Sequence, residues 1–222
     1  MALWKFFTLL TSLGAKERLA LSLRYMKDDP QNNIRVSPPL LRKEVTFHEP
    51  YSGDYIHGYM VNAGFSENVM KWHRQHPRIP LRFFWDKWEE EPVKRVDNTL
   101  SFYQLDDVEF LRQMAGCKAY ASTAGFESVC EAMYLGKPIL MVPAHIEQDC
   151  NAYDAQKSGA GIISSDFNLQ QLLEFAKDYH PNRDFVYWVR GAEYTLLNLL
   201  ESDSSNYQQV LFNEMYLVEE FI

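Results

Sequence analysis

One run of the sequence, residues 119–161, constrains the fold more than any other stretch. It holds two short apolar segments, at 118–121 and 139–142, and each is followed by a loop and then by a helical pattern. Strands that alternate with helices are typical of βαβ units, in which helices cover both faces of a parallel sheet. Right-handed crossovers then favour a doubly wound, Rossmann-like α/β fold. Ligands of such sheets bind where the strands end, so we expect this run to carry the functional site.

The same alternation continues on both sides of this run. Further strands are expected at 55–61, 81–85, 100–105 and 161–164. Helices are expected at 66–76, 106–115, 125–135, 148–158 and 168–179, and two more at the C-terminus, from residue 184 and over 207–222. Ser66, Asp106 and Asn168 are the expected N-caps, with Glu109 as the capping-box partner of Asp106.

The first 50 residues differ from this pattern. Residues 1–27 are expected to form an amphipathic helix in two pieces, broken near Gly14, whose apolar side chains need a surface to cover them. That surface is either this chain, a missing neighbour or a membrane. Residues 28–50 resemble a linker, because Asp29-Pro30 and Pro38-Pro39 oppose regular helix. The expected parts are therefore 1–50 (helix and linker), 51–180 (α/β domain) and 181–222 (C-terminal helices).

Composition excludes several classes of protein. A net charge of −8 opposes generic binding of nucleic acid, which needs a basic surface. No apolar run reaches the length of a membrane span, and the N-terminus lacks the basic start of a signal peptide, although secretion stays an alternative. The three cysteines form no CxxC pair, which suits a reducing cytoplasm, and Cys150 stays open as a nucleophile. We expect a cytoplasmic protein, either free or associated with a membrane.

Two turns between a strand and a helix are candidate anion sites. In Asn62-Ala63-Gly64 the glycine lets main-chain N–H groups approach an anion at a helix start, but a plain tight turn is the favoured explanation of a single glycine there. The loop of Ser122, Thr123, Ala124 and Gly125 leaves room for a phosphate and offers hydroxyl and N–H donors. Neither a Walker A loop nor a GxGxxG fingerprint is present, so ATPase and dinucleotide-binding functions are not indicated.

Polar side chains follow these turns. Glu131 shares a helix face with Glu127 and suits the two hydroxyls of a ribose, unless it is a solvated helix carboxylate. The densest polar cluster follows Pro143 and suits a polyhydroxylated ligand, whereas a metal site would need a further ligand. Its members are His145, Glu147, Gln148 and Asn151. The main chain at Leu105 to Asp107 could contact a nucleobase edge.

Taken together, residues 122–152 resemble the donor-binding motif of the C-terminal domain of glycosyltransferase family 28. The best-known member of that family transfers N-acetylglucosamine onto the lipid-linked peptidoglycan precursor. Five elements occur in the order of the family pattern: 122–125, Ser128-Val129-Cys130-Glu131, Gly136-Lys137-Pro138, Val142-Pro143 and Gln148-Asp149-Cys150-Asn151-Ala152. The weaker flanks extend the resemblance to about residues 51–179.

The resemblance implies the donor half of a GT-B glycosyltransferase, an enzyme that transfers a hexosyl group from a nucleotide diphosphate sugar, with UDP favoured. By the resemblance Glu131 binds the ribose, and Glu147 and Gln148 hold the sugar hydroxyls. The 122–125 loop holds the diphosphate, with the Asn62–Gly64 turn facing it, and Leu105 contacts the base. Ser128, His145 and Asn151 complete the expected set. Neither a cofactor nor a metal is implied.

One departure from the family bears on activity. Such enzymes have two Rossmann-like domains, and the acceptor site and the catalytic base lie in the N-terminal one. This chain has room for the C-terminal domain alone, so we expect donor binding with little or no transfer, and either a missing domain or a partner chain. A non-catalytic nucleotide-sugar subunit, a sugar-nucleotide epimerase of the same architecture and a structural flavodoxin-like domain stay as alternatives.

Overall fold

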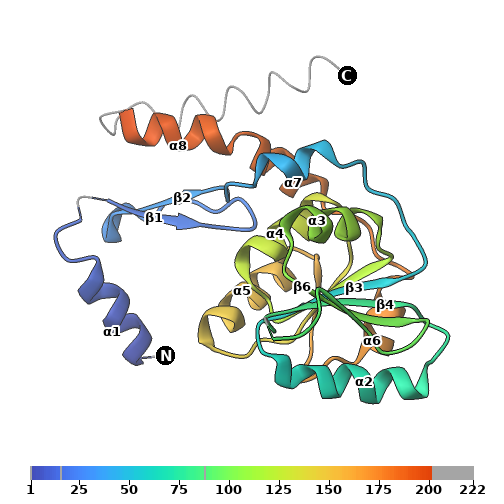
Figure 1. Cartoon of the computed structure of the whole chain (residues 1–222). Helices are drawn as coiled ribbons and strands as arrows, with labels where there is room; N and C mark the ends of the chain where they lie inside the picture. Colours follow the sequence, from blue (N-terminus) through green and yellow to red (C-terminus); the bar gives the residue numbers. More distant parts are fainter. Residues whose placement is uncertain (1, 16, 88, 202–222) are drawn as a thin grey trace.

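A computed structural model describes residues 2–15, 17–87 and 89–201, and a seven-stranded sheet forms its centre (Figure 1). The strand order is β5-β6-β4-β3-β7-β8-β9. All neighbouring pairs are parallel except β5 with β6. The strands are β3 (Ile56–Met60), β4 (Leu81–Trp85), β5 (Val93–Arg95), β6 (Leu100–Gln104), β7 (Ala119–Ser122), β8 (Ile139–Met141) and β9 (Gly161–Ile163). This arrangement is the expected doubly wound sheet.

Helices cover both faces of the sheet, because the central strands are apolar on both sides. On one face α3 (Asp107–Gly116), α4 (Phe126–Tyr134), α5 (Ile146–Lys157) and α7 (Arg183–Arg190) enclose a core around Phe84 and Tyr120. On the other face α2 (Ser66–Gln75) and α6 (Leu169–Phe175) pack on Phe83 and Phe102 (Figure 1). Two buried clusters, one on each face, therefore fix the sheet between layers of helices.

Outside the N-terminal segment, most of the predicted elements are found within one or two residues of their expected bounds. Strand β5 lies in the segment predicted as a charged loop; its three residues are exposed and pair with β6 at the sheet edge. Helix α5 begins two residues earlier than predicted, and α6 ends four residues before Tyr179. The C-terminal helix from residue 183 breaks at Gly191 and continues as α8 (Ala192–Glu201). The helix predicted over 207–222 lies outside the described residues.

The predicted caps had mixed outcomes. Asp106 caps α3 as expected, because its Oδ1 accepts the N–H of Glu109 at 2.8 Å. Glu109 does not complete a capping box; its carboxylate accepts from Arg112 and Gln113 instead. Ser66 is the first residue of α2 rather than its cap, because the short 3-10 helix Ala63–Phe65 precedes it. The prediction for Ser66 was therefore wrong.

The N-terminal segment differs most from expectation. Helix α1 (Ala2–Thr11) ends before Gly14, whose positive φ of 81° no longer fits a helix. The second predicted helix is instead a strand, β1 (Arg18–Leu21), paired in parallel with β2 (Ile34–Ser37). Short 3-10 helices at Pro30–Asn32 and Lys43–Phe47 flank β2 in the predicted linker. Helical periodicity misled here because β1 is held by pairing with a separate segment, β2, which the local pattern of residues 18–21 does not reveal.

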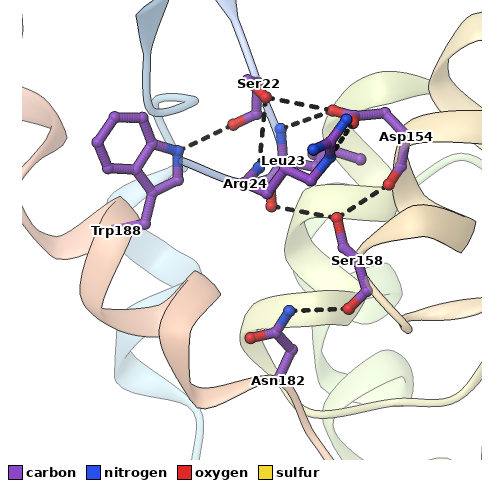
Figure 2. Close-up of polar contacts among 7 residues, drawn as sticks. All are labelled: Ser22, Leu23, Arg24, Asp154, Ser158, Asn182 and Trp188. Carbon is purple, nitrogen blue, oxygen red and sulfur yellow. Dashed lines mark hydrogen bonds and ion pairs between the residues drawn. The ribbon is translucent and has the colours of Figure 1, made fainter. Parts of the chain in front are cut away.

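A polar cluster fixes the chain after β1 to the main domain (Figure 2). Asp154 of α5 accepts hydrogen bonds from the N–H of Leu23 at 3.0 Å and from Nε of Arg24 at 2.9 Å. Nε1 of Trp188 in α7 donates to the carbonyl of Ser22 at 3.0 Å. Ser158 and Asn182 extend the cluster along α5 and into α7. The small β1–β2 sheet is thus held in a defined place beside the central sheet.

Within the described ranges, no helix has both the length and the apolar character that crossing a membrane requires.

Candidate functional site

The site lies at the carboxyl edge of the sheet, where β3, β7 and β8 end side by side. The loops after β3 and β7 are joined by two hydrogen bonds. The N–H of Thr123 donates to the carbonyl of Tyr59, and the N–H of Val61 donates to Oγ1 of Thr123, both at 3.3 Å. The two predicted anion turns are therefore neighbours in space.

The 122–125 loop turns sharply before α4. Ala124 is fully buried with a φ of +60°, a conformation that costs a non-glycine residue energy. The turn is held from both sides: Oγ of Ser122 accepts the N–H of Ala124 at 3.1 Å, and Nδ2 of Asn151 donates to its carbonyl at 3.2 Å. Ser122 and Thr123 are buried, so their hydroxyls shape the loop rather than face solvent.

The start of α4 offers main-chain donors to an anion. Gly125 occupies the N-cap position in an extended conformation and provides no capping side chain. The first N–H groups of a helix have no partner within the helix, and the helix dipole adds partial positive charge there. Oγ of Ser128 donates back to the carbonyl of Gly125 at 3.2 Å. An anion can therefore meet the helix at this end without displacing a cap.

The turn at Asn62 is exposed and locally satisfied. Oδ1 of Asn62 accepts the N–H of Gly64 at 2.8 Å, an arrangement that shapes the turn by itself. These residues therefore form a tight turn, and the turn lies beside the 122–125 loop.

The cluster after Pro143 divides into two kinds of residue. His145 is the N-cap residue of α5 and is exposed, as is Glu147. Gln148 is buried, and its Oε1 accepts the N–H of Ala144 at 2.8 Å. Gln148 and Asn151 therefore organise the loops after β8 and β7, whereas His145 and Glu147 are open to a ligand at the start of α5.

Glu131 is neither solvated nor alone. Its side chain is 3% exposed, and its Oε1 accepts from Nε of Arg42 at 2.6 Å. Burial raises the pKa of Glu131, and Arg42 offsets part of that shift. In turn, the hydrogen bond to Glu131 raises the pKa of Arg42. The alternative of a solvated helix carboxylate is therefore wrong.

Arg42 also reaches the start of α3. Its Nη1 lies 3.1 Å from Oδ1 of Asp107, two residues after Leu105, which is 39% exposed. The guanidinium thus joins the two places where a nucleoside was expected, at Leu105 and at Glu131. Arg42 was not among the predicted site residues, because it lies 89 residues from Glu131 in a proline-rich segment. A basic side chain after Pro38-Pro39 was the available signal.

The described residues hold no cluster of three or more His, Cys, Asp or Glu side chains that could bind a metal ion. Cys150 is exposed on α5, whereas burial raises the pKa of Cys117 to about 12 and also raises that of Cys130.

The chain resembles several solved glycosyltransferases. The glycotransferase of kitacinnamycin is 14% identical, with a TM-score of 0.55, over 80% of this chain and 51% of that one. UGT89C1 of Arabidopsis thaliana is 15% identical, with a TM-score of 0.49, over 80% and 49%. LpCGTa, solved in complex with UDP, is 14% identical, with a TM-score of 0.48, over 83% and 48%. The first likeness confirms the doubly wound α/β fold, and the chain spans about half the length of each of these proteins.

Family membership comes from the sequence as a whole. No curated protein matches the chain significantly. The family model of Glycosyl transferase family 1 matches residues 19–179, a range that contains all of β1 but its first residue, β2 and the whole central sheet. The narrower resemblance to family 28 stays a prediction. Because this match covers most of the chain, the protein belongs to Glycosyl transferase family 1.

Proposed function

We propose that this chain is the donor half of a glycosyltransferase and binds a nucleotide diphosphate sugar, with UDP as the nucleotide, for hexosyl transfer. The observation that carries the proposal is the ion pair between the buried Glu131 and Arg42, because Glu131 belongs to α4, the helix whose N-terminus is open to an anion. Family membership supports the reaction class.

The proposed binding mode follows from the charges at this edge. The diphosphate lies at the start of α4, where main-chain N–H groups and the helix dipole favour negative charge. The ribose hydroxyls donate to Glu131, and the base contacts the main chain at Leu105. When the ribose occupies Glu131, Arg42 is free to turn its guanidinium toward the phosphates. His145 and Glu147 face the sugar, and Gln148 keeps their loop in place.

The chemistry required of this half is stabilisation of the leaving group. Departure of a nucleoside diphosphate builds negative charge on its phosphate oxygens, and fixed N–H donors lower the energy of that state. The catalytic base and the acceptor site belong to a second domain, which we propose to be either part of a longer chain or a separate partner. Residues 51–180 are the proposed donor domain. By itself it binds the donor with little or no transfer.

Calorimetric titration with UDP, GDP and several UDP-sugars tests this proposal. We expect UDP and at least one UDP-sugar to bind one site per chain, and GDP to bind more weakly because the base contacts differ. If none of these compounds binds at millimolar concentration, the chain is not a donor half and the proposal is wrong.

A non-catalytic nucleotide-sugar subunit is the second candidate, because Glu131 and the open start of α4 would serve donor binding without transfer equally well. Both candidates bind the donor. They differ when an acceptor-side domain is added: transfer of labelled sugar supports the enzyme, and binding without transfer supports the subunit.

A further inference from the structure

The small sheet beside the central domain is incomplete as a structural unit. It consists of β1 and β2 alone, paired in parallel from Arg18↔Ile34 to Leu21↔Ser37. Parallel sheets occur almost always with more strands and with both faces covered, and two strands by themselves are marginally stable. Yet Leu19 and Leu21 of β1 are 48% and 47% exposed. The strand that carries these apolar side chains, β1, therefore pairs with β2 along one edge and has no strand along its other edge among the described residues.

The hydrogen bonds of β1 identify its open edge. The N–H of Arg18 donates to the carbonyl of Asn33, and that of Ser22 donates to the carbonyl of Ser37. In a parallel pair, alternate residues of a strand bond to a given neighbour. The N–H and C=O groups of Leu19 and Leu21 therefore point away from β2, and no main-chain partner for them occurs among the described residues. A further strand would find its donors and acceptors there.

The outer edge of β2 is already occupied, because the N–H of Ile34 donates to the carbonyl of Asp29 in an isolated antiparallel bridge. Helix α8 packs against β2, and Figure 1 shows it lying along the β1–β2 pair, outside the main domain. The Asp154 and Trp188 contacts of Figure 2 hold the end of β1 on α5 and α7. The sheet can therefore grow through β1 alone, and the direction of growth is fixed relative to the donor site.

Helix α1 adds an apolar surface at the same end of the molecule. Nε of Arg18 donates to Oγ of Ser12 at 2.8 Å, which ties the segment after α1 to the start of β1. The helix and the turn after it carry large apolar side chains that are more than half exposed, at Phe6, Phe7, Leu9, Leu10 and Leu13. A lipid surface could cover these side chains but offers no strand to the open edge. An α/β domain can supply both.

We propose that the open edge of β1 accepts a parallel strand from a second α/β domain, which also covers α1. The partner is an α/β domain that extends the β1–β2 sheet. We expect this domain to be the acceptor-side half of the glycosyltransferase, an identity that rests on the proposed function. The half-length coverage of the solved glycosyltransferases supports an occupant of this size. The docking surface itself depends only on the sheet edge and α1.

A model strand tests the edge directly. The probe is a synthetic heptapeptide with the sequence of residues 17–23 and a nitroxide at its N-terminus, added to the full chain at up to millimolar concentration. In the free chain, the amides of Leu19 and Leu21 should exchange at least ~10-fold faster than the ladder amide of Ala20. The peptide should slow that exchange and broaden the NMR signals near Arg18 rather than near Ser22, which marks a parallel strand.

Two proline variants separate docking from folding. Leu21→Pro removes an outward N–H and should abolish peptide binding while the β1–β2 pair persists. Ala20→Pro removes a ladder bond and should disrupt the pair itself. UDP titration of the same samples tests the donor site independently of the sheet edge. If the peptide binds but UDP does not, the proposed function is wrong and the docking proposal stands.

Three results would overturn the docking proposal. They are slow exchange of Leu19 and Leu21 in the free monomer, no effect of the peptide at millimolar concentration, and a self-associated dimer that buries β1. Binding of α1 to phosphatidylcholine vesicles without any response to the peptide would assign the surface to a membrane instead, and would equally overturn it.

Discussion

Glu131 combines burial with an ion pair, and this makes its role in nucleotide binding measurable. The Glu131→Gln substitution keeps the size of the side chain. It removes the negative charge of the carboxylate that would accept hydrogen bonds from the two ribose hydroxyls. Hydrogen bonds to charged groups contribute about 1–3 kcal/mol, so UDP affinity should fall roughly 5- to 150-fold in calorimetry. Glu127→Gln, one turn earlier on α4 and exposed, is the matched control and should bind UDP normally. Equal affinities for the two variants would show that Glu131 has no part in binding.

His57 makes the stability of the protein depend on pH, because it is buried inside the central sheet. It is fully buried in β3 against Phe110 and Tyr120, and burial lowers its pKa from 6.5 to about 3. Between these values the unfolded chain binds a proton that the folded chain does not. The stability is therefore complete above pH 6.5 and declines as the pH falls toward 3.

The resulting prediction concerns the slope of stability with pH. Between pH 7 and pH 4.5, His57 should lower the free energy of unfolding by about 2–3 kcal/mol, measured by urea denaturation. The His57→Phe variant should lose this part of the slope. The control is His180→Asn, at an exposed histidine, which should keep it. An unchanged slope in His57→Phe would mean that His57 is protonated in the folded protein.

At the scale of elements, the close packing of neighbouring strands limits the size of the side chains that fit between them. A Cβ added at Gly161 of β9 would lie 2.2 Å from the carbonyl oxygen of Ile139 in β8, and a main-chain atom cannot move aside cheaply. Gly161→Ala should lower the free energy of unfolding by about 1–3 kcal/mol, the usual cost of overpacking. Gly191→Ala is the control, since its nearest neighbours lie 3.9 Å away. A neutral Gly161→Ala would show that β8 and β9 lie further apart than the structure places them.

The central elements could be predicted from the sequence because their signals are local. Strands β3, β4, β6, β7 and β8 are short apolar runs bounded by turn residues, and Asp106 signals its helix directly. Strands β1, β2 and β5 carry no such signal, since each depends on a neighbour that local periodicity does not reveal. The helix predicted after Gly14 failed for this reason.

The features of the candidate site likewise divide into those that local sequence signals predicted and those that depend on distant segments. The position of the 122–125 loop and of the α5 start followed from where strands end, and the structure places both at one edge. Which side chains face a ligand could not be predicted, because Ser122 and Gln148 turn inward to the main chain of their own loops, and Asn151 bonds to the loop before α4. The Glu131–Arg42 pair joins segments 89 residues apart, and one sequence holds no record of that contact.

At the scale of the whole molecule, Asp154 connects the N-terminal segment to the main domain. Asp154→Asn cannot serve the Leu23 amide, the Ser22 hydroxyl and the Arg24 guanidinium together, so the segment should loosen. We expect a loss of about 1–3 kcal/mol in local protection, seen as faster amide exchange over residues 18–24, with UDP affinity unchanged. Asp149→Asn, exposed on the same helix, should alter neither. Unaltered exchange in Asp154→Asn would mean that Trp188 and α8 hold the segment without it.

The same polar cluster has a consequence for synthesis of the chain. Ser22 meets Asp154 across 132 positions and Trp188 across 166. A ribosome that adds about 5–20 residues per second makes the first 24 residues roughly 10–30 s before the surface that holds them is complete. Residues 22–24 therefore cannot dock until α5 and α7 have been made, so their contacts with the main domain form late in synthesis.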